Sequence, residues 1–217
     1  MKVLIINPNS DLEMTAAIQR TAKNFARKKF EVLCKSTPGA PKFIETYEDG
    51  ILAAPGMIGL VRKNDSECDA FIIACHCDPN LDVLKETAKK PVVGIGEASM
   101  RIASMMGHRF SVIQTTQESI PMKEALVKKY QLQDGLASIR APNPEQENMD
   151  EDEKYLAVAR AAMEKDKADV IVLGCAGLTG MDKRLQKALG VPVLDGVACG
   201  LIMVTALIKG SSVALKI

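Results

Sequence analysis

Short apolar runs alternate along the chain with longer segments in which apolar residues recur at the spacing of a helix face. A short apolar run bounded by polar or turn-forming residues is typical of a buried strand in a parallel sheet. The expected strands lie at 2–6, 30–34, 70–75, 92–95, 110–114, 135–140, 168–175 and 193–194. The expected helices lie at 12–27, 50–63, 79–89, 96–106, 118–129 and 196–209, with two more that end at 166 and begin near 179. This alternation predicts an α/β fold with parallel sheets and βαβ crossovers.

The pattern repeats within the chain. Two matching apolar runs end in Cys75 and Cys175, which are 100 positions apart. The start of the chain, Lys2–Asn7, matches Phe110–Thr115 with an offset of 108. Two related halves with a cysteine at the same strand end predict two lobes related by a pseudo-twofold axis, with both thiols facing one cleft.

The repeat also predicts the domain boundaries. We expect the first lobe to comprise residues 1–97 plus 200–217 and the second lobe to comprise residues 98–199. The segment 36–42, with two prolines and a glycine, is an irregular loop of the kind that carries function or acts as a lid. The acidic segment 143–153 is interpreted as a solvated loop and helix start.

The residues after Cys75 favour a reactive position for its thiol. Asp78 is expected to be a helix N-cap, with Pro79 at the first helical position, and Thr179 is expected to cap the helix after Cys175. Cys75 would then lie at the carboxyl end of a central strand, close to a helix N-terminus. Open α/β sheets bind ligands at that edge, and a helix N-terminus lowers the pKa of a thiol.

Composition narrows the class of partner. Lys plus Arg is 28 and Asp plus Glu is 27, which gives a net charge of +1. A nucleic-acid binder usually carries a basic surplus, so no nucleic-acid partner is expected. A small anionic ligand stays open. A hydrophobic content of 47% with 25% charged residues is ordinary for a soluble globular protein.

The location is expected to be cytoplasmic. The longest apolar stretch, 196–208, is shorter than the roughly 20 residues that span a bilayer, so no membrane association is expected. The start of the chain reads as a strand and is too short for a signal peptide. The six cysteines fall in apolar strands or helices, which favours a reducing compartment over a disulfide-bonded secreted protein.

Cys75 and Cys175 are the leading candidates for chemistry. Buried core thiols are the alternative, because cysteine is among the most buried residue types, but the matching strand ends favour function. Cys77 completes a Cys75-His76-Cys77 triplet, yet zinc would need two more ligands and His108 is the only other histidine. No metal is therefore expected, and a Cys75–Cys175 redox pair would lack the Cys-x-x-Cys spacing. The remaining cysteines are assigned to the core: Cys34, Cys68 and Cys199.

Other local motifs are weaker. Gly94–Gly96 is not a dinucleotide fingerprint, since the next glycine would fall at Ser99. The breaks after strands at Asn7–Asn9, Thr115–Thr116 and Ala176–Gly177 offer amide, hydroxyl and backbone N–H groups. Such groups suit carboxylate or carbonyl oxygens. Capping of the following helices is an equally good explanation for any one of them.

Two thiols across a cleft suit a racemase. Such an enzyme removes a proton from one face of a carbon and returns one to the other face, which needs two groups of similar pKa. One group is a thiolate and the other a thiol, and they exchange roles in each turnover. Backbone donors would hold the charge that develops on the adjacent carbonyl. No metal or organic cofactor is required.

Several motifs resemble the aspartate/glutamate/hydantoin racemase superfamily, and its hydantoin and allantoin racemases most closely. The motifs are Ile6-Asn7-Pro8-Asn9-Ser10 with Met14-Thr15, Ala74-Cys75 followed by Asp78-Pro79, the run Pro91–Ala98, and the run Val172–Gly177. They cover nearly the whole chain in the family's order. The resemblance implies two Rossmann-like lobes with the active site between them, racemisation without a cofactor, and Cys75 and Cys175 as the acid–base pair.

The resemblance also implies a set of residues that line the substrate pocket. By motif match they are Asn7, Ile44, His76, Thr115, Thr116, Ala176 and Gly177. Two motifs depart from the family. Phe43–Thr46 replaces a Ser-Ile-Glu-Gly pattern, and His76-Cys77 replaces a phenylalanine followed by a small or acidic residue. A more polar pocket wall follows, which affects the choice of substrate and not the class of reaction.

The leading hypothesis is therefore a cofactor-independent racemase that acts on a hydantoin- or allantoin-type ureide or on an amino acid. The substrate would be a small molecule with carbonyl or carboxylate groups, and we expect a homo-oligomer. A decarboxylase or isomerase of the same superfamily is the first alternative, although related decarboxylases typically keep one of the two cysteines. A two-lobed binding protein without catalysis is the second alternative, and it would need no thiol pair.

Overall fold

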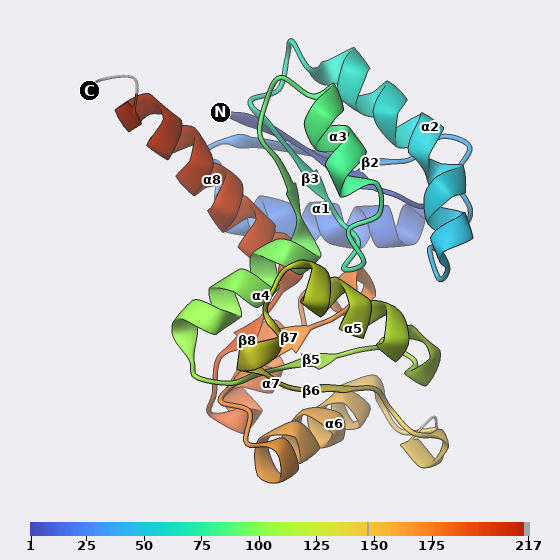
Figure 1. Ribbon diagram of the computed structural model, residues 1–217, viewed down its shortest axis with the longest axis vertical. Coiled ribbons are helices and arrows are strands. Elements are labelled where there is room, and N and C mark those ends of the chain that lie inside the picture. Colours follow the sequence, from blue (N-terminus) through green and yellow to red (C-terminus); the bar gives the residue numbers. More distant parts are fainter. Residues whose placement is uncertain (147, 215–217) are drawn as a thin grey trace. The chain divides into compact units, whose positions relative to one another are not determined.

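The chain forms two parallel four-stranded sheets with helices packed around them (Figure 1). The structure is a computed structural model that describes residues 1–146 and 148–214. Backbone contacts divide it into two compact units, here called the first lobe (Met1–Ala98 and the segment from Val197) and the second lobe (Ser99–Gly196). The predicted α/β class with two parallel sheets is confirmed.

The first lobe has the strand order β2-β1-β3-β4, with all strands parallel. Its strands are β1 (Lys2–Asn7), β2 (Glu31–Ser36), β3 (Ala70–Ile73) and β4 (Val92–Gly94). Its helices are α1 (Leu12–Ala26), α2 (Tyr47–Asn64), α3 (Leu81–Thr87) and α8 (Gly196–Ala214), and α4 (Ile95–Met106) runs on into the residues of the second lobe. The side chains of β3 are all buried, as expected for a central strand of a parallel sheet covered on both faces.

The second lobe has the matching order β6-β5-β7-β8. Its strands are β5 (Phe110–Ile113), β6 (Leu136–Arg140), β7 (Val170–Leu173) and β8 (Val193–Leu194). Its helices are α5 (Ile120–Lys129), α6 (Glu151–Asp166) and α7 (Asp182–Leu189), with short 3-10 turns η1 (Gln117–Ser119), η2 (Gln133–Gly135), η3 (Pro144–Gln146) and η4 (Ala176–Leu178). Side chains from α6, β7 and α7 form one apolar core under this sheet.

Strand pairing corrects one offset of the internal repeat. In the first lobe Ile6 pairs with Ile73, and in the second lobe Ile113 pairs with Leu173. Ile73 and Leu173 are related by the 100-residue repeat, so Ile6 corresponds to Ile113, an offset of 113 − 6 = 107. The expected offset of 108 is wrong. The residue after β1, Asn7, therefore corresponds to Gln114 and not to Thr115.

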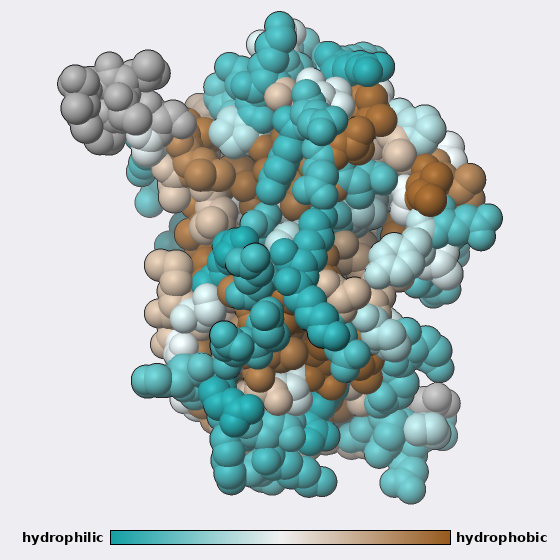
Figure 2. Space-filling view, in the orientation of Figure 1, coloured by the Kyte–Doolittle hydropathy of each residue, from teal (hydrophilic) through white to brown (hydrophobic). Residues whose placement is uncertain are grey.

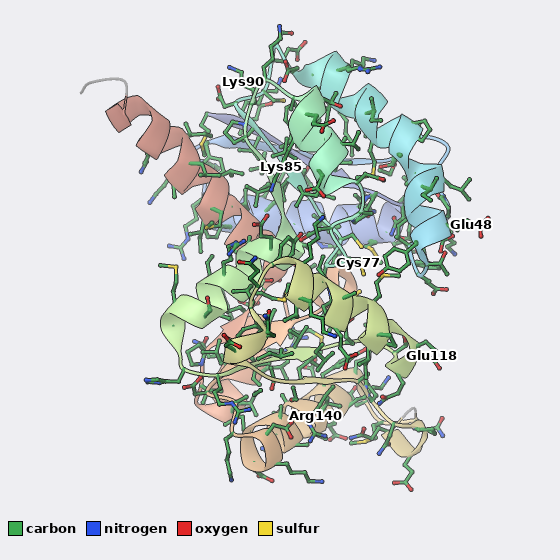
Figure 3. The ribbon with its side chains drawn as sticks, viewed as in Figure 1. Glu48, Cys77, Lys85, Lys90, Glu118 and Arg140 are labelled. Atoms are coloured by element: carbon green, nitrogen blue, oxygen red, sulfur yellow. The ribbon has the colours of Figure 1, made fainter. Side chains whose placement is uncertain are left out.

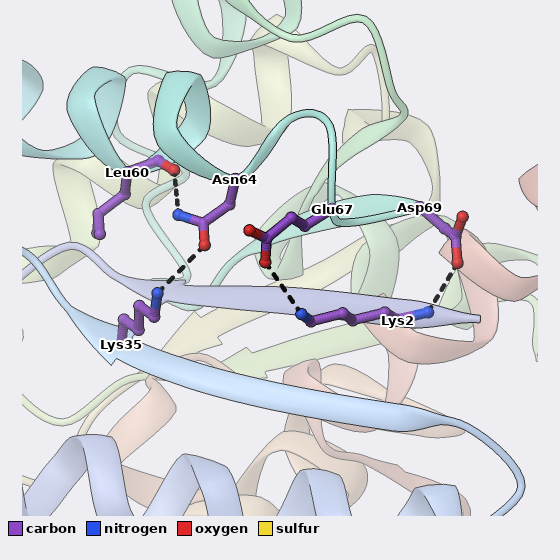
Figure 4. A network of polar contacts seen from close by, with 6 residues as sticks. All are labelled: Lys2, Lys35, Leu60, Asn64, Glu67 and Asp69. Carbon is purple, nitrogen blue, oxygen red and sulfur yellow. Dashed lines mark hydrogen bonds and ion pairs between the residues drawn. The ribbon is translucent and has the colours of Figure 1, made fainter.

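Polar contacts hold the strands of the first lobe in register (Figure 4). At the start of β1, the Lys2 backbone N–H donates to the Asp69 carboxylate at 2.7 Å, and the Lys2 ammonium lies 3.3 Å from Glu67. On the edge strand β2, the Lys35 ammonium donates to the side-chain oxygen of Asn64 at 3.2 Å. These contacts tie strand residues to the end of α2 and to the segment between α2 and β3. The parallel pairing of Ile6 with Ile73 places the carboxyl ends of β1 and β3 side by side.

Helix α2 begins at Tyr47, earlier than the predicted start at Gly50. The Thr46 hydroxyl accepts a hydrogen bond from the Asp49 backbone N–H at 3.1 Å, and the Asp49 carboxylate accepts one from the Thr46 N–H at 2.9 Å. This reciprocal capping box satisfies two donors that the first turn leaves without helix partners. Pro55 consequently lies inside the helix and not near its start.

Apolar side chains are also exposed on the first lobe. Ile51 and Leu52 are 70% and 55% exposed, and apolar atoms gather over this half of α2 (Figure 2). A patch of this kind is typical of an interaction surface, and the homo-oligomer expected from the sequence remains a prediction. Across the residues that the structure describes, no helix has both the length and the apolar character needed to cross a membrane.

Candidate active site

Cys75 and Cys175 begin the same turn after equivalent strands. Cys75 follows β3, and its carbonyl oxygen accepts a hydrogen bond from the Asp78 N–H at 3.0 Å. Cys175 follows β7, and its carbonyl oxygen accepts one from the Leu178 N–H at 3.1 Å. Both side chains are partly exposed. The predicted position of each cysteine, at the carboxyl end of a central parallel strand, is the edge at which α/β sheets bind ligands.

The Cys175 thiol has a backbone donor within its own turn. Cys175 has an extended backbone and occupies the N-cap position of the 3-10 turn η4. The Gly177 backbone N–H lies 3.3 Å from the Cys175 sulfur. A backbone N–H that points at sulfur favours the thiolate over the thiol. The turn thus provides the kind of setting in which a cysteine serves as a base.

Asp78 fastens the Cys75 turn to helix α4. Its two carboxylate oxygens accept hydrogen bonds from the N–H groups of Gly96 at 2.9 Å and Glu97 at 2.7 Å, in the first turn of α4. A side chain at Gly94 would collide with the Asp78 carboxylate, and one at Gly96 would lie within 2.5 Å of the His76 carbonyl. The two glycines therefore have a local role, which is to make room for the Cys75 turn.

Asp78 was expected to cap the helix that follows it, and this is wrong. Helix α3 begins only at Leu81, with Asn80 at the N-cap position. Asp78 and Asn80 both have positive φ angles, of 47° and 60°. This backbone turns the Asp78 carboxylate away from α3 and towards α4. The Asn80 side chain instead donates to the Gly50 carbonyl in α2 at 2.6 Å.

A different carboxylate fastens the Cys175 turn. Asp195, immediately after β8, is 3% exposed and accepts hydrogen bonds from the Thr179 hydroxyl at 2.6 Å and the Gly180 N–H at 2.9 Å. Thr179 thus holds the end of the turn and does not cap α7, whose N-cap position is occupied by Met181. The prediction of Thr179 as a helix cap is wrong, because its hydroxyl is bonded to Asp195.

Asn7 lies fully buried at the carboxyl end of β1. Its side-chain amide nitrogen donates to the Asn9 side-chain oxygen at 2.6 Å and to the Thr15 hydroxyl at 2.9 Å. Its backbone carbonyl accepts from the Thr37 hydroxyl at 2.7 Å. The Asn7 side-chain oxygen has no hydrogen-bond partner among the described residues. A buried acceptor of this kind is costly unless a water or a ligand satisfies it.

Gln114 occupies the equivalent position in the second lobe, and the sequence pattern missed it. Its side chain is 2% exposed, and its amide nitrogen has no partner within the described part of the chain. That nitrogen lies over Gly174, where an added side chain would come within 2.8 Å of it. The strand pairing identifies Gln114, whereas the apolar pattern alone pointed to Thr115.

The structure places the predicted pocket residues in two sets. The first lobe carries Asn7, Ile44, Cys75 and His76, and the second lobe carries Thr115, Thr116, Cys175, Ala176 and Gly177. His76 and Ala176 are buried, Thr116 and Gly177 are exposed, and Ile44 and Thr115 are intermediate. Asn7, Cys75 and His76 share the carboxyl edge of the first sheet. Thr115, Cys175 and Ala176 share that edge of the second sheet, and Ile44 lies in the segment between β2 and α2.

Tyr155 is a further residue near the second cysteine. It is 4% exposed in α6, within the core cluster against which Cys175 packs. Burial, together with the smaller effect of the negative charges of Glu151 and Cys175, raises its pKa to about 12. Its phenol therefore stays protonated at neutral pH. Nothing in the sequence pattern distinguished this tyrosine from an ordinary core residue.

The remaining cysteines have different settings. Burial raises the pKa of the Cys34 thiol to about 12, and it also raises that of Cys68. Cys68 and Cys199 are each 2% exposed. Among the residues that the structure describes, no group of three or more His, Cys, Asp or Glu side chains could hold a metal ion. Catalysis without a cofactor stays a prediction.

Comparison with known proteins identifies the family. The family model for Asp/Glu/Hydantoin racemase matches residues 3–204. The chain belongs to this family, and the predicted enzyme class, an isomerase of the racemase type, is confirmed.

Individual relatives cover almost the whole chain. A hydantoin racemase from Pseudomonas sp. (strain NS671) is 40% identical over 206 residues, which are 92% of this chain and 83% of that protein. A hydantoin racemase from Rhizobium meliloti is 35% identical and covers 100% of this chain and 92% of its own. The solved structure of an allantoin racemase from Klebsiella pneumoniae is 31% identical, with a TM-score of 0.90, and covers 97% of this chain and 89% of its own.

Proposed function

We propose that this protein is a cofactor-independent racemase of a hydantoin- or allantoin-type ureide, with Cys75 and Cys175 as the two acid–base groups. The observation that carries the proposal is the matched pair of turns. Each cysteine is the first residue of a hydrogen-bonded turn after the third strand of its lobe, with carbonyl acceptance at 3.0 and 3.1 Å. One cysteine from each lobe is what proton transfer on both faces of one carbon requires.

The proposed reaction begins with removal of the proton on the stereogenic ring carbon. The thiolate of one cysteine takes this proton, and the negative charge moves onto the adjacent carbonyl oxygen. Donors aimed at that oxygen lower the barrier, because they act where charge develops. The thiol of the other cysteine then delivers its proton to the opposite face. The carbon ends with inverted configuration, and the two cysteines have exchanged protonation states.

The side chains support a neutral, polar substrate. Asn7 and Gln114 present an acceptor and a donor that the described residues leave unsatisfied. A ureide ring carries both N–H and C=O groups, so it offers a donor for the Asn7 oxygen and an acceptor for the Gln114 nitrogen, each considered within its own lobe. A free amino acid would instead bring an ammonium and a carboxylate, which call for charged partners. The hydantoin and allantoin racemases among the relatives agree with the ureide.

The test is isotope exchange with single-cysteine variants in deuterated water. Cys75→Ser and Cys175→Ser each replace a thiol, a group whose ordinary pKa is about 8.5, by a hydroxyl that is a far weaker acid. Racemisation needs both partners, so we expect either variant to lose at least about a thousandfold, which is about 4 kcal/mol in the barrier. Proton abstraction needs only the surviving thiolate. One variant should exchange the ring proton of one enantiomer, and the other variant that of its mirror image.

Allantoin and a 5-substituted hydantoin are the substrates to try, with aspartate and glutamate as controls. Chirality is followed by circular dichroism, and exchange by NMR. If both variants exchange the same enantiomer, or if one keeps full racemisation, a one-base mechanism replaces the two-base mechanism. If the wild type racemises only an amino acid, the proposed substrate class is wrong while the cysteine pair stands.

A further inference from the structure

The first lobe has a thiol that the second lobe lacks. By the 100-residue repeat, Cys75-His76-Cys77 corresponds to Cys175-Ala176-Gly177. Both segments form the same hydrogen-bonded turn, closed by the residue three positions after the cysteine. Cys77 lies in the loop after β3 (Figure 3), and the two-base reaction has no use for it. The two turns can therefore be compared directly: the position two residues after the cysteine is a second cysteine in the first lobe and a glycine in the second.

The turn keeps Cys75 and Cys77 close together. Consecutive Cα atoms are about 3.8 Å apart, so the Cα atoms of Cys75 and Cys77 are at most about 7.6 Å apart, and a turn brings them closer than an extended chain does. Disulfides join residues whose Cα atoms are about 4.4–6.8 Å apart. The turn is anchored at its end, because Asp78 is bonded to Gly96 and Glu97. The Cα atoms of Cys75 and Cys77 therefore stay near each other within a turn that is anchored at its end.

The settings of the other thiols limit oxidation to few sites. Cys68 and Cys199 are each 2% exposed, and oxidants reach them poorly. Burial raises the pKa of Cys34 to about 12, so it holds almost no thiolate at neutral pH. Cys34 has intermediate exposure, as Cys75, Cys77 and Cys175 do, so its raised pKa is what sets it apart from these three cysteines. Of these, Cys75 and Cys77 share one turn.

We propose that Cys77 is a resolving cysteine, which closes a reversible disulfide with Cys75 when a hydroperoxide oxidises the Cys75 thiolate. In the first step the Cys75 sulfur attacks the peroxide, an S–O bond forms, the O–O bond breaks, and the alkoxide or hydroxide that leaves takes a proton. In the second step the Cys77 thiolate attacks the Cys75 sulfenic acid, an S–S bond forms, the S–O bond breaks, and hydroxide leaves as water after protonation. The balance is two thiols plus one hydroperoxide to one disulfide, one alcohol and one water.

The consequence for activity rests on the proposed function. A Cys75 sulfur in a disulfide can neither take nor give a proton, so racemisation stops. A thiol reductant restores both thiols and the activity with them. Without Cys77, the Cys75 sulfenic acid is open to further oxidation to a sulfinic acid, which thiols do not reverse. Cys77 therefore protects the catalytic cysteine from permanent loss while it switches the enzyme off.

Peptide mass spectrometry after peroxide treatment tests the disulfide without reference to activity. Purified protein is treated with hydrogen peroxide, its remaining thiols are alkylated, and it is digested with trypsin. Cleavage after Lys63 and Lys85 releases one peptide that holds Cys68, Cys75 and Cys77. Cys68→Ala is the matched control, since it removes the buried cysteine and leaves only the pair in this peptide. We expect this variant and the wild type to form the Cys75–Cys77 disulfide, seen as the loss of two hydrogens.

Recovery of activity separates the resolving role from simple damage. After peroxide and then dithiothreitol, we expect the wild type and Cys68→Ala to recover most of their racemisation, whereas Cys77→Ala recovers less than about a tenth. Recovery is expressed as a fraction of the activity of the same protein before peroxide treatment. The proposal is overturned if Cys75 pairs with Cys175, if no disulfide forms, or if Cys77→Ala recovers as fully as the wild type. A disulfide in a protein that racemises nothing would disprove the proposed function alone.

Discussion

The two lobes fasten equivalent cysteine turns with carboxylates from different places in the fold. In the first lobe the carboxylate belongs to the turn itself, since Asp78 reaches from the Cys75 turn to the start of α4. In the second lobe it belongs to the neighbouring strand end, since Asp195 reaches from β8 to the residues after Cys175. The strand register aligns Asp195 with Gly94, the position that the first lobe must keep empty for Asp78. A bridge between the two strand ends occurs in both lobes, although the residue that supplies it differs.

A second compensating difference in side-chain volume between the lobes lies at the ends of β1 and β5. The first lobe has the shorter amide Asn7 and, before its cysteine, Ala74. The second lobe has the longer amide Gln114 and, before its cysteine, Gly174. The Gln114 amide nitrogen lies where a methyl group at position 174 would come within 2.8 Å of it. An extra methylene on one strand is thus matched by a missing methyl group on the next, as close packing requires.

Removal of the bridging carboxylates should have the largest effect on stability. The two losses also show which cysteine turn depends more on its carboxylate. Asp78→Ala removes the acceptor of one buried and one partly buried backbone N–H group of α4, which we expect to lower the free energy of unfolding by about 3 kcal/mol. Asp195→Ala removes the acceptor of the Gly180 N–H and of the Thr179 hydroxyl, and we expect a loss of about 2 kcal/mol. Urea unfolding measures both.

The outcome also tests which turn depends more on its carboxylate. Asp78→Asn keeps one acceptor oxygen and is expected to fall between the wild type and Asp78→Ala. A larger loss for Asp195→Ala than for Asp78→Ala would contradict the ranking. It would mean that the Thr179 hydroxyl bond is worth more than a second backbone N–H bond.

An exchange of amide and methyl between the lobes gives a smaller effect and tests the packing relation. We expect Gly174→Ala to cost about 2 kcal/mol, because the added methyl group meets the Ile113 carbonyl, the Val112 side chain and the Gln114 amide. Gln114→Asn in the same protein removes one of these three contacts. The double variant should therefore be more stable than the sum of the single variants predicts, by about 1 kcal/mol.

A glycine in open surroundings provides the control for this cycle. Apart from the backbone of α2 itself and the two chain neighbours, no atom of the described residues lies within 4 Å of a methyl group added at Gly59, so Gly59→Ala should keep or raise stability. Strict additivity of Gly174→Ala and Gln114→Asn would show that the Gln114 side chain moves aside at no cost. The differences between Asn7 and Gln114 and between Ala74 and Gly174 would then be unrelated in packing.

Sequence patterns revealed the parts of this molecule that depend on neighbours along the chain. The run Ala70–Ile73 is apolar and became a central strand, and the matching ends at Cys75 and Cys175 followed from the same reasoning. The Thr46–Asp49 capping box was present in the sequence, but the exposed apolar residues that follow it hid the start of α2.

The misassigned residues are those whose partners are distant in sequence. Capping rules link Asp78 to the next helix, whereas its positive φ turns it to Gly96, 18 positions away. Gln114 was missed because the apolar run of β5 can be aligned with β1 at offset 107 or 108 with similar quality. Only the pairing of Ile113 with Leu173 decides between the two offsets.

The edge strands of the two sheets offer the last contrast, between a neutral and a charged contact. Strand β2 is held by an amide of α1, since the Gln19 side chain donates to the Val32 carbonyl at 3.1 Å and accepts from the Cys34 N–H at 2.7 Å. Strand β6 ends in Arg140, whose guanidinium donates to both oxygens of Asp166 in α6 at 2.5 and 2.8 Å. The bonds from Arg140 lower the pKa of Asp166. The contribution of the Gln19 amide contact to the free energy of unfolding should be independent of pH, whereas that of the Arg140–Asp166 ion pair should depend on it.

The pH dependence follows from the direction of the Asp166 shift. A carboxylate with a lowered pKa in the folded state adds stability above its unfolded pKa of about 3.9, and this stability is lost as the pH falls through the folded pKa. The pair is partly exposed, so we expect Asp166→Asn to cost only about 1 kcal/mol at pH 7 and progressively less below pH 4. Gln19→Met is the control, with a loss that is the same at both pH values. Urea unfolding at pH 7 and pH 3 measures all three proteins, and an equal loss for Asp166→Asn at the two pH values would show that the charge of Asp166 contributes nothing beyond its hydrogen bonds.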